Sequence, residues 1–251
     1  MSMRWMGLFF LGLVTWSLAQ KPTPPPPPRV LLSVPMGLPL GKTTMLELRG
    51  QGLERVTAVT VSVGKVKLLG KEKVPVPNGL DASRVGESRL RLEYTAPGEA
   101  DAAAAVAEVE LTLTAPEGKA SAKVLLESAA VVHEKEPNDG FRQAQPIQLG
   151  NTLAGVISYP QDVDVYRFAG KKGQRVQIEV LAARRGSGLD AFLQLYDDKG
   201  QLLQSSDDVD GSRDAYLKRT LPREGEYFIV VSDADDTGGP THVYRLVLLA
   251  K

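Results

Sequence analysis

The chain has 251 residues, 43% of them apolar, which is enough for one large domain or for two domains of about 100 residues with cores of their own. Thirty basic residues balance thirty acidic ones, which excludes a strong net field for nucleic acid, and the absence of cysteine excludes disulfides, thiolate metal sites and thiol nucleophiles. With only two histidines, sites that need several imidazoles are excluded as well.

The first nineteen residues have the features of a secretory signal peptide. Arg4 precedes an apolar run from Gly7 to Trp16, and Ser17 and Ala19 place small residues at the −3 and −1 positions of a cleavage site. The run is shorter than the roughly 20 residues that span a bilayer comfortably. We therefore expect cleavage after Ala19, no membrane span in the mature chain, and export to the periplasm, the cell surface or the medium.

A proline-rich linker is predicted over residues 20–28. Pro24 to Pro28 are five consecutive prolines, which favour extended polyproline II and cannot continue a helix or pair in a sheet. The run is interpreted as a stiff spacer rather than a ligand for a proline-reading domain, since such domains are mostly intracellular.

Residues 29–130 alternate short apolar runs with glycine and proline, the pattern of an immunoglobulin-like β-sandwich. An alanine-rich stretch at 99–107 is compatible with a helical turn, but the strand after it favours a loop insertion. Strands are expected at Arg29–Val34, Thr43–Arg49, Ala58–Val63, Lys65–Leu69, Ser88–Tyr94, Ala107–Thr114 and Ala120–Glu127.

The opening of this region is similar to a known hairpin. Pro35 to Gly37, followed by Gly41 to Leu53 (GKTTMLELRGQGL), resembles the first hairpin of IPT/TIG-type immunoglobulin-like domains. The resemblance implies a spacer or recognition module and transfers no site.

Residues 131–251 contain thirteen of the fifteen aspartates and predict a second, jelly-roll sandwich. Glycine-containing turns separate its strands, and Asp198-Lys199-Gly200 is typical of a tight hairpin. Eight strands are expected at Thr152–Ile157, Val163–Ala169, Arg175–Ala182, Ala191–Tyr196, Gln201–Ser205, Ala215–Leu221, Glu226–Ser232 and His242–Leu249.

Several ordered motifs in this half match one family. Glu134 to Asp139 (EKEPND) is followed by Asp162 to Phe168 (DVDVYRF), Leu189 to Asp197 (LDAFLQLYD), Gly225 to Val231 (GEYFIVV) and Tyr244 to Leu246 (YRL). Residues 132–251 thereby resemble the bacterial pre-peptidase C-terminal domain, and the collagen-binding domains of bacterial collagenases are similar. Such domains are jelly-roll sandwiches attached to secreted peptidases and other surface proteins.

The acidic opening motif suits a calcium ion, which takes six to eight oxygen ligands. Glu134, Glu136 and Asn138 alternate, so in an extended segment their side chains project to one side. The alternative is a solvated acidic linker with an Asx turn at Asn138-Asp139. In calcium-binding relatives this segment and the later aspartate pair supply the ligands, so the resemblance implies six positions: Glu134, Glu136, Asn138, Asp139, Asp162 and Asp164.

Two further acidic stretches, Asp208 to Asp214 and Asp233 to Gly239, are interpreted as polar loops. The first imitates half of an EF-hand loop, but Arg219 stands at its twelfth position. No G-x-S-x-G or H-E-x-x-H motif occurs, and no catalytic residue is proposed.

The expected function is that of an exported, non-catalytic binding or accessory protein that contacts an extracellular or envelope protein or polymer. One alternative is a purely structural spacer or stabiliser in a surface assembly. Another is an accessory subunit that acts with a separate secreted peptidase. A binding face would expose clustered tyrosines, whereas a spacer would bury or scatter them.

Overall fold

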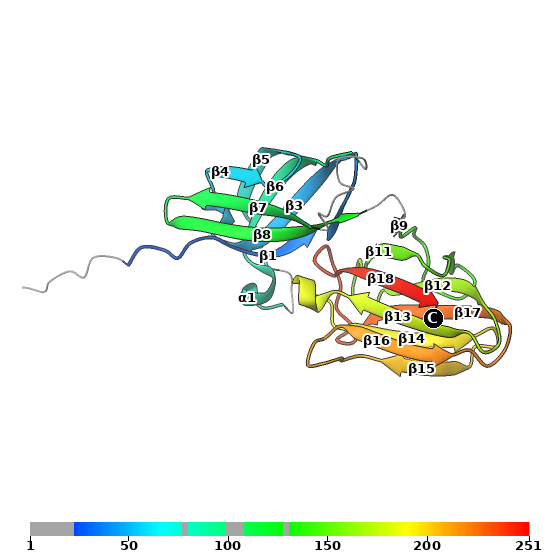
Figure 1. Cartoon of the computed structure of the whole chain (residues 1–251). Coiled ribbons are helices and arrows are strands. Elements are labelled where there is room, and N and C mark those ends of the chain that lie inside the picture. The colour runs from blue at the N-terminus through cyan, green and yellow to red at the C-terminus, as the bar shows by residue number, and fades with distance from the viewer. Residues whose placement is uncertain (1–22, 77–79, 99–107, 128–130, 251) are drawn as a thin grey trace, which may run out of the picture.

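The computed structural model describes residues 23–76, 80–98, 108–127 and 131–250, which form an almost entirely β structure (Figure 1). The sequence-based expectation of an all-β fold is confirmed. Within those ranges the helical segments are three short ones: η1 (Leu53–Arg55), α1 (Ala82–Val85) and η2 (Ala183–Arg185). The leader and the alanine-rich stretch at 99–107 lie outside the described residues.

The first sandwich has the strand order of an immunoglobulin-like domain. One sheet has the order β1-β3-β6-β5 and the other β2-β8-β7-β4, so the first, third, sixth and fifth strands face the rest, as in constant-type immunoglobulin sandwiches. Alternate residues of β3, β6 and β7 point inward, and Leu48, Leu92 and Leu111 are fully buried between the sheets. The strands are β1 (Arg29–Val34), β2 (Gly37–Pro39), β3 (Thr43–Gln51), β4 (Ala58–Val61), β5 (Lys65–Lys73), β6 (Ser88–Thr95), β7 (Glu108–Ala115) and β8 (Gly118–Glu127).

The second sandwich is a jelly roll. Strands β11 to β18 divide between two sheets, β12-β17-β14-β15 and β16-β13-β18-β11, and the chain crosses between the sheets at every connection except the β14–β15 hairpin. Two short strands extend the sheets, β10 beside β12 and β9 beside β11. The strands are β9 (Val131–His133), β10 (Gln145–Pro146), β11 (Thr152–Val156), β12 (Val163–Gly170), β13 (Arg175–Leu181), β14 (Ala191–Asp197), β15 (Leu202–Ser206), β16 (Ala215–Thr220), β17 (Gly225–Asp233) and β18 (Val243–Ala250).

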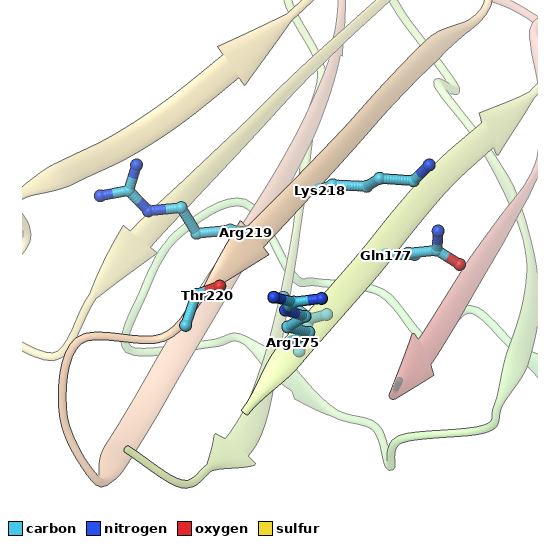
Figure 2. Close-up of a pocket in the computed structure, with 6 residues that line it drawn as sticks. Arg175, Gln177, Lys218, Arg219 and Thr220 are labelled. Carbon is cyan, nitrogen blue, oxygen red and sulfur yellow. The ribbon is translucent and has the colours of Figure 1, made fainter. Parts of the chain in front are cut away.

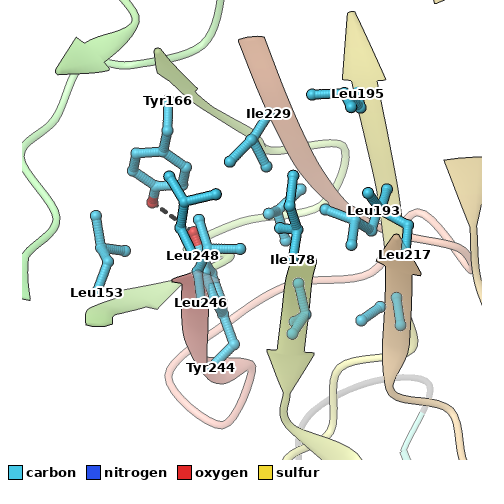
Figure 3. Packing of buried hydrophobic residues seen from close by; sticks show 14 of the residues in the cluster. Leu153, Tyr166, Ile178, Leu193, Leu195, Leu217, Ile229, Tyr244, Leu246 and Leu248 are labelled. Carbon is cyan, nitrogen blue, oxygen red and sulfur yellow. Dashed lines mark hydrogen bonds between the residues drawn. The ribbon is translucent and has the colours of Figure 1, made fainter. Parts of the chain in front are cut away.

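Apolar side chains from both sheets meet in the middle of this jelly roll (Figure 3). Leu193 and Ile229 come from one sheet, and Ile178, Leu217 and Leu246 from the other, and all are buried. Because the inward residues alternate with outward polar ones, the outer faces of the sheets and the loops carry most of the charged groups.

Polar contacts join the two sandwiches. Glu127 at the end of β8 and Arg245 in β18 form an ion pair of 2.5 Å, with side chains only 5% and 13% exposed. Glu108 pairs with Arg185 at 3.1 Å. Burial raises the pKa of Glu127, and the positive charge of Arg245 opposes that rise. The limits 29–130 and 131–251 remain a prediction about independent folding units.

Residues 23–28, which include the proline run, have no regular secondary structure and lead into β1 of the first sandwich (Figure 1). The Pro26 carbonyl accepts a hydrogen bond from the Arg55 guanidinium at 2.8 Å, so the end of the run is tied to the sandwich. Among the described residues, no helix has the length and apolar character needed to cross a bilayer.

Candidate metal centre

The carboxylates of the opening motif and of β12 are brought together by two backbone contacts. β9 runs parallel to β11, and Glu134 continues this pairing by donating its N–H to the Ala154 carbonyl at 3.0 Å. Val165 in β12 donates to the Asn138 carbonyl at 2.9 Å. The 134–139 segment is thereby held against the start of β12, beside Asp162 and Asp164.

Two overlapping groups of three carboxylates result. Glu134, Glu136 and Asp164 each place an oxygen within 4.8 Å of the others, as do Glu136, Asp139 and Asp162. Glu136 belongs to both groups, so the five acidic residues form one continuous cluster, which we call the carboxylate cluster. All five were among the expected positions, and their role as calcium ligands remains a prediction.

Asn138, the sixth expected position, is fully buried beside this cluster. Its side-chain amide donates to Glu134 at 3.2 Å, and its backbone N–H donates to Glu136 at 3.0 Å. Its Oδ1 and the Oδ1 of Asp164 are buried without a hydrogen-bond donor. Buried polar atoms are normally satisfied, so two orphaned oxygens beside five carboxylates fit a cation.

Two buried tyrosines, whose hydroxyls meet in the core (Figure 3), lie against the carboxylate cluster. Tyr166 donates its hydroxyl to Glu134 at 3.0 Å, Tyr244 donates to Asp164 at 2.5 Å, and the two hydroxyl oxygens are 2.5 Å apart. Three hydrogen bonds link these four side chains, but two hydroxyls supply only two protons. Without a cation, a third proton on one of the two carboxyls completes the chain.

The electrostatics of the cluster agree with that proton count. Burial, with hydrogen bonding to Glu134 and its charge, raises the pKa of Asp164 to about 10. Burial also raises the pKa of Glu136, and the charges of Asp162 and Glu134 add to the rise. Within the described part of the chain, none of the five carboxylates forms an ion pair with a basic side chain.

Residues 162–233 match the family model described as the bacterial pre-peptidase C-terminal domain. A probable subtilase-type serine protease from Deinococcus radiodurans is 38% identical over 120 residues, which are 45% of this chain and 16% of the protease. Residues 162–233 thus belong to a pre-peptidase C-terminal domain, and we use this name for the jelly roll that contains them. The family match includes Asp162 and Asp164 of the carboxylate cluster and begins after the 134–139 segment.

Two solved structures resemble part of the chain. The pre-peptidase C-terminal domain of a collagenase from Bacillus anthracis has 20% identity and a TM-score of 0.34, and covers 46% of this chain and 99% of its own. PliG of Aeromonas hydrophila, a periplasmic inhibitor of g-type lysozyme, has 16% identity and a TM-score of 0.34, with coverages of 48% and 97%. The jelly-roll assignment rests on the strand order of the pre-peptidase C-terminal domain itself.

The opening segment of this domain is not the uniform extended strand that alternation predicts. β9 ends at His133, its pairing with β11 continues for one more backbone hydrogen bond at Glu134, and the chain bends at Glu136. The ligand positions converge because the segment turns back onto β12, where Asn138 is held by Val165. The alternation in the sequence identified Glu134, Glu136 and Asn138, and the turn brings Asp139 into the carboxylate cluster as well.

The tyrosines were not expected at the site. Tyr166 and Tyr244 lie in motifs that carry the family resemblance, but nothing in the local pattern shows that their hydroxyls meet. Tyr244 crosses β11 at Gly155, where a Cβ would lie 2.5 Å from the ring carbon that bears the hydroxyl. Gly155 is therefore required for Tyr244 to reach the carboxylates.

The other acidic stretches of the pre-peptidase C-terminal domain have structural roles. Asp214 is buried and accepts hydrogen bonds from Ala182 N–H at 2.9 Å and from the Arg184 side chain at 2.5 Å. Asp233 accepts from Asp235 N–H at 2.9 Å and from the Thr237 hydroxyl at 3.0 Å. Both aspartates organise loops.

His242 is buried in the same domain and hydrogen-bonds to Thr237 at 2.9 Å. Its side chain is 1% exposed and lies 3.9 Å from Asp233, and burial lowers its pKa. A substrate has no access to this imidazole, so the Thr237, His242 and Asp233 constellation stabilises a turn.

Proposed function

We propose that the chain is an exported, non-catalytic accessory protein of the bacterial cell envelope or exterior, and that calcium stabilises its pre-peptidase C-terminal domain. The carboxylate cluster carries the calcium part of this proposal. Five acidic side chains without a basic partner repel one another, and the buried oxygens of Asn138 and Asp164 have no donor. A Ca²⁺ ion removes both costs, because it supplies positive charge and accepts carboxylate and amide oxygens together.

Export is supported by the leader, with its apolar run and its small residues Ser17 and Ala19. The accessory role is supported by the family match and by the protease of Deinococcus radiodurans, in which the similar segment is 16% of the length. We infer that the immunoglobulin-like sandwich acts as a spacer that holds the pre-peptidase C-terminal domain away from its point of attachment.

A second candidate role is that of a subunit acting with a separate secreted peptidase. The observation that favours it is the same similarity, since the relative that shares this domain is itself a probable protease. Co-purification with a secreted peptidase from the culture medium would distinguish this role from binding to an envelope polymer.

The tyrosines bear on the choice between binding and spacing. Tyr166, Tyr227 and Tyr244 are buried, and Tyr196 and Tyr216 are half-buried on different sheets. Among the domain's tyrosines that the structure describes, Tyr159 alone is exposed, and half of its surface is accessible (50%). Clustered exposed tyrosines therefore do not support a binding face, and a binding surface has to be sought in other chemistry.

The test of the calcium proposal uses residues 20–251 and isothermal titration calorimetry with Ca²⁺ and Mg²⁺. We expect one Ca²⁺ per chain and much weaker Mg²⁺ binding, because Mg²⁺ prefers a small octahedron and gives up its waters reluctantly. Glu136→Gln should abolish binding, since Glu136 belongs to both carboxylate groups. Asp236→Asn removes an equal charge from an exposed turn outside the cluster and should leave it intact. Absence of Ca²⁺ binding in the unmutated chain would leave an acidic linker and no metal site.

A further inference from the structure

The carboxylate cluster and a group of basic residues lie at opposite ends of the pre-peptidase C-terminal domain. Val163, at the start of β12, pairs with Ser232, near the end of β17, so the carboxylate cluster and the Asp233 turn lie at one end. Gly170, at the end of β12, pairs with Gly225 at the opposite end. Strands of seven or eight residues set the two ends about 20 Å or more apart.

Five basic residues gather at that opposite end, and we call them the distal basic patch. They belong to the turn after β12, to the first residue of β13 and to the last part of β16. Their members are Lys171, Lys172, Arg175, Lys218 and Arg219, all exposed. The first sandwich contacts the domain through Arg185, Gly188 and Arg245, near the other end, so the patch is free of it.

Strand register builds a shallow cavity within the patch (Figure 2). Arg175 pairs with Thr220, and Gln177 pairs with Lys218 across the β13–β16 ladder. Together with Arg219 they line an open cavity of about 440 Å³. Lys218 and Arg219 leave β16 in opposite directions, so positive charge faces both the outer surface and the sheet edge.

An aromatic ring lies next to this cavity. Tyr216 precedes Lys218 by two residues and therefore shares its face of β16. The Lys218 ammonium lies 5.2 Å from the centre of the Tyr216 ring, and Gln177 donates to the Tyr216 hydroxyl at 2.8 Å. These contacts hold Lys218 and Gln177 in place beside Arg175.

The patch residues differ from the paired arginines of the domain in having no acidic partner. Arg167, Arg184 and Arg223 each form an ion pair at 2.7 Å or less. None of the five patch residues forms one with any residue that the structure describes. The patch is thus an unneutralised positive surface on a domain whose acidic residues lie mostly elsewhere.

We propose that the distal basic patch binds an anionic polysaccharide whose charge is carried by phosphate or sulfate groups. Charge complementarity selects an anion, and the arginine forks of Arg175 and Arg219 match the oxygens of these groups. The open cavity and the spread of charge over two strands and a turn fit a chain of repeating anions better than a single small ion. This inference rests on the proposed function, for which it names a class of partner.

A simpler reading is that Lys218 and Arg219 only prevent edge-to-edge pairing of β16, which is an edge strand. The first sandwich supplies a matched comparison. Its edge strand β5 also carries two exposed lysines, Lys65 and Lys67. If edge protection were the whole role, the two edges would behave alike toward polyanions.

The experiment measures binding of residues 20–251 to four fluorescent probes by anisotropy at 50 and 300 mM NaCl. Heparin supplies sulfate, a purified teichoic acid supplies phosphate, double-stranded DNA is a different polyanion, and dextran is neutral. We expect binding to heparin or teichoic acid, none to dextran, and at least about a tenfold loss at the higher salt as condensed counterions are released. Whichever of the two probes binds more tightly identifies the anion.

Two double variants with equal charge change decide whether the patch is responsible. Arg175→Glu with Lys218→Glu should weaken binding at least about tenfold, in line with the loss of two charge-assisted contacts. Lys65→Glu with Lys67→Glu should change it less than about twofold. Equal losses in both variants, no binding to any probe, or tighter binding to DNA than to either polysaccharide would overturn the proposal. Melting temperatures and Ca²⁺ titrations of both variants separate this result from that of the calcium proposal, because the patch and the carboxylate cluster lie at opposite ends.

Discussion

Replacing Asp164 with asparagine should move the stability of the pre-peptidase C-terminal domain in opposite directions with and without calcium. Asp164 is fully buried, one of its oxygens accepts from Tyr244, and the other has no donor. An asparagine of the same shape replaces the carboxyl group that must bind a proton with a neutral amide, whose N–H can donate in place of that proton.

In EDTA the variant should be the more stable protein. The pKa of Asp164 is raised to about 10, so at pH 7.5 folding requires a carboxyl group that is ionised in the unfolded chain to take up a proton. Each pH unit above the unfolded pKa costs about 1.4 kcal/mol, which is an upper bound because the surrounding side chains relax. Since asparagine needs no proton, we expect a gain of about 1–2 kcal/mol, or a rise of roughly 5 °C in melting temperature.

In calcium the order should reverse. A ligand at 100 times its Kd stabilises the folded state by about 2.7 kcal/mol, which for a domain of this size is on the order of 10 °C. Loss of the Asp164 carboxylate should remove most of that gain. The assay is differential scanning calorimetry of residues 20–251 in EDTA and in millimolar Ca²⁺, with Asp236→Asn as the charge-matched control. A calcium shift unchanged by Asp164→Asn would refute its role as a ligand, and equal destabilisation in both buffers would refute the repulsion argument.

Five further outcomes are expected. The raised pKa of Asp164 stabilises the metal-free fold at pH values below the unfolded pKa of this group, and this stability is lost as the pH rises toward 10. The melting temperature in EDTA should therefore fall between pH 5 and pH 8, and the increase in melting temperature caused by calcium should grow over the same range. An increase that does not depend on pH would contradict the proton count. Gly155→Ala should displace Tyr244 and so lower both the calcium affinity and the stability of the domain, which calorimetry measures. An affinity and a stability equal to those of the unmutated chain would show that the Tyr244 ring can move aside. Arg245→Met should lower the free energy of unfolding by about 3 kcal/mol, because it leaves Glu127 buried and unpaired. In a denaturant titration, adding Glu127→Gln to this variant should restore part of the lost stability. Losses that simply add in the double variant would argue against the ion pair. The intact mass of the exported protein should place its first residue at Gln20, and retention of Met1 would contradict this. Limited proteolysis should release a stable fragment of about 132–251, and a lack of cooperative unfolding in that fragment would contradict the division into two domains.

Much of the fold could be predicted because strand periodicity is a local signal. The eight strands expected in the jelly roll agree with β11 to β18 to within about two residues at each end. β9 and β10 were missed because strands of three and two residues have no measurable period, and β10 contains Pro146. β5 extends to Lys73, beyond the predicted end at Leu69, because its pairing with β6 continues past an irregularity at Gly70.

The candidate site could be predicted only in part. Short spacings such as Asp162 and Asp164 are visible in the chain, and the family resemblance joins them to the 134–139 segment. The hydroxyls of Tyr166 and Tyr244 could not be placed, since their meeting depends on the register of strands almost 80 residues apart. The distal basic patch was hidden for another reason. Its residues come from the turn after β12, from β13 and from β16, which meet only in the folded domain, and an overall charge of zero does not reveal such a group.

The parallel pairing of β9 with β11 has a mechanical consequence. A tensile load that separates the two sandwiches enters the jelly roll through β9, whose three residues pair with Thr152, Leu153 and Ala154. Where the load acts along the strands, these backbone hydrogen bonds resist it together instead of opening one by one. Glu134 follows β9 directly and is fastened to Val156 and Tyr166. The point where tension enters the domain is therefore also the point where the carboxylate cluster begins. An ion bound there would raise the force needed to separate β9 from β11.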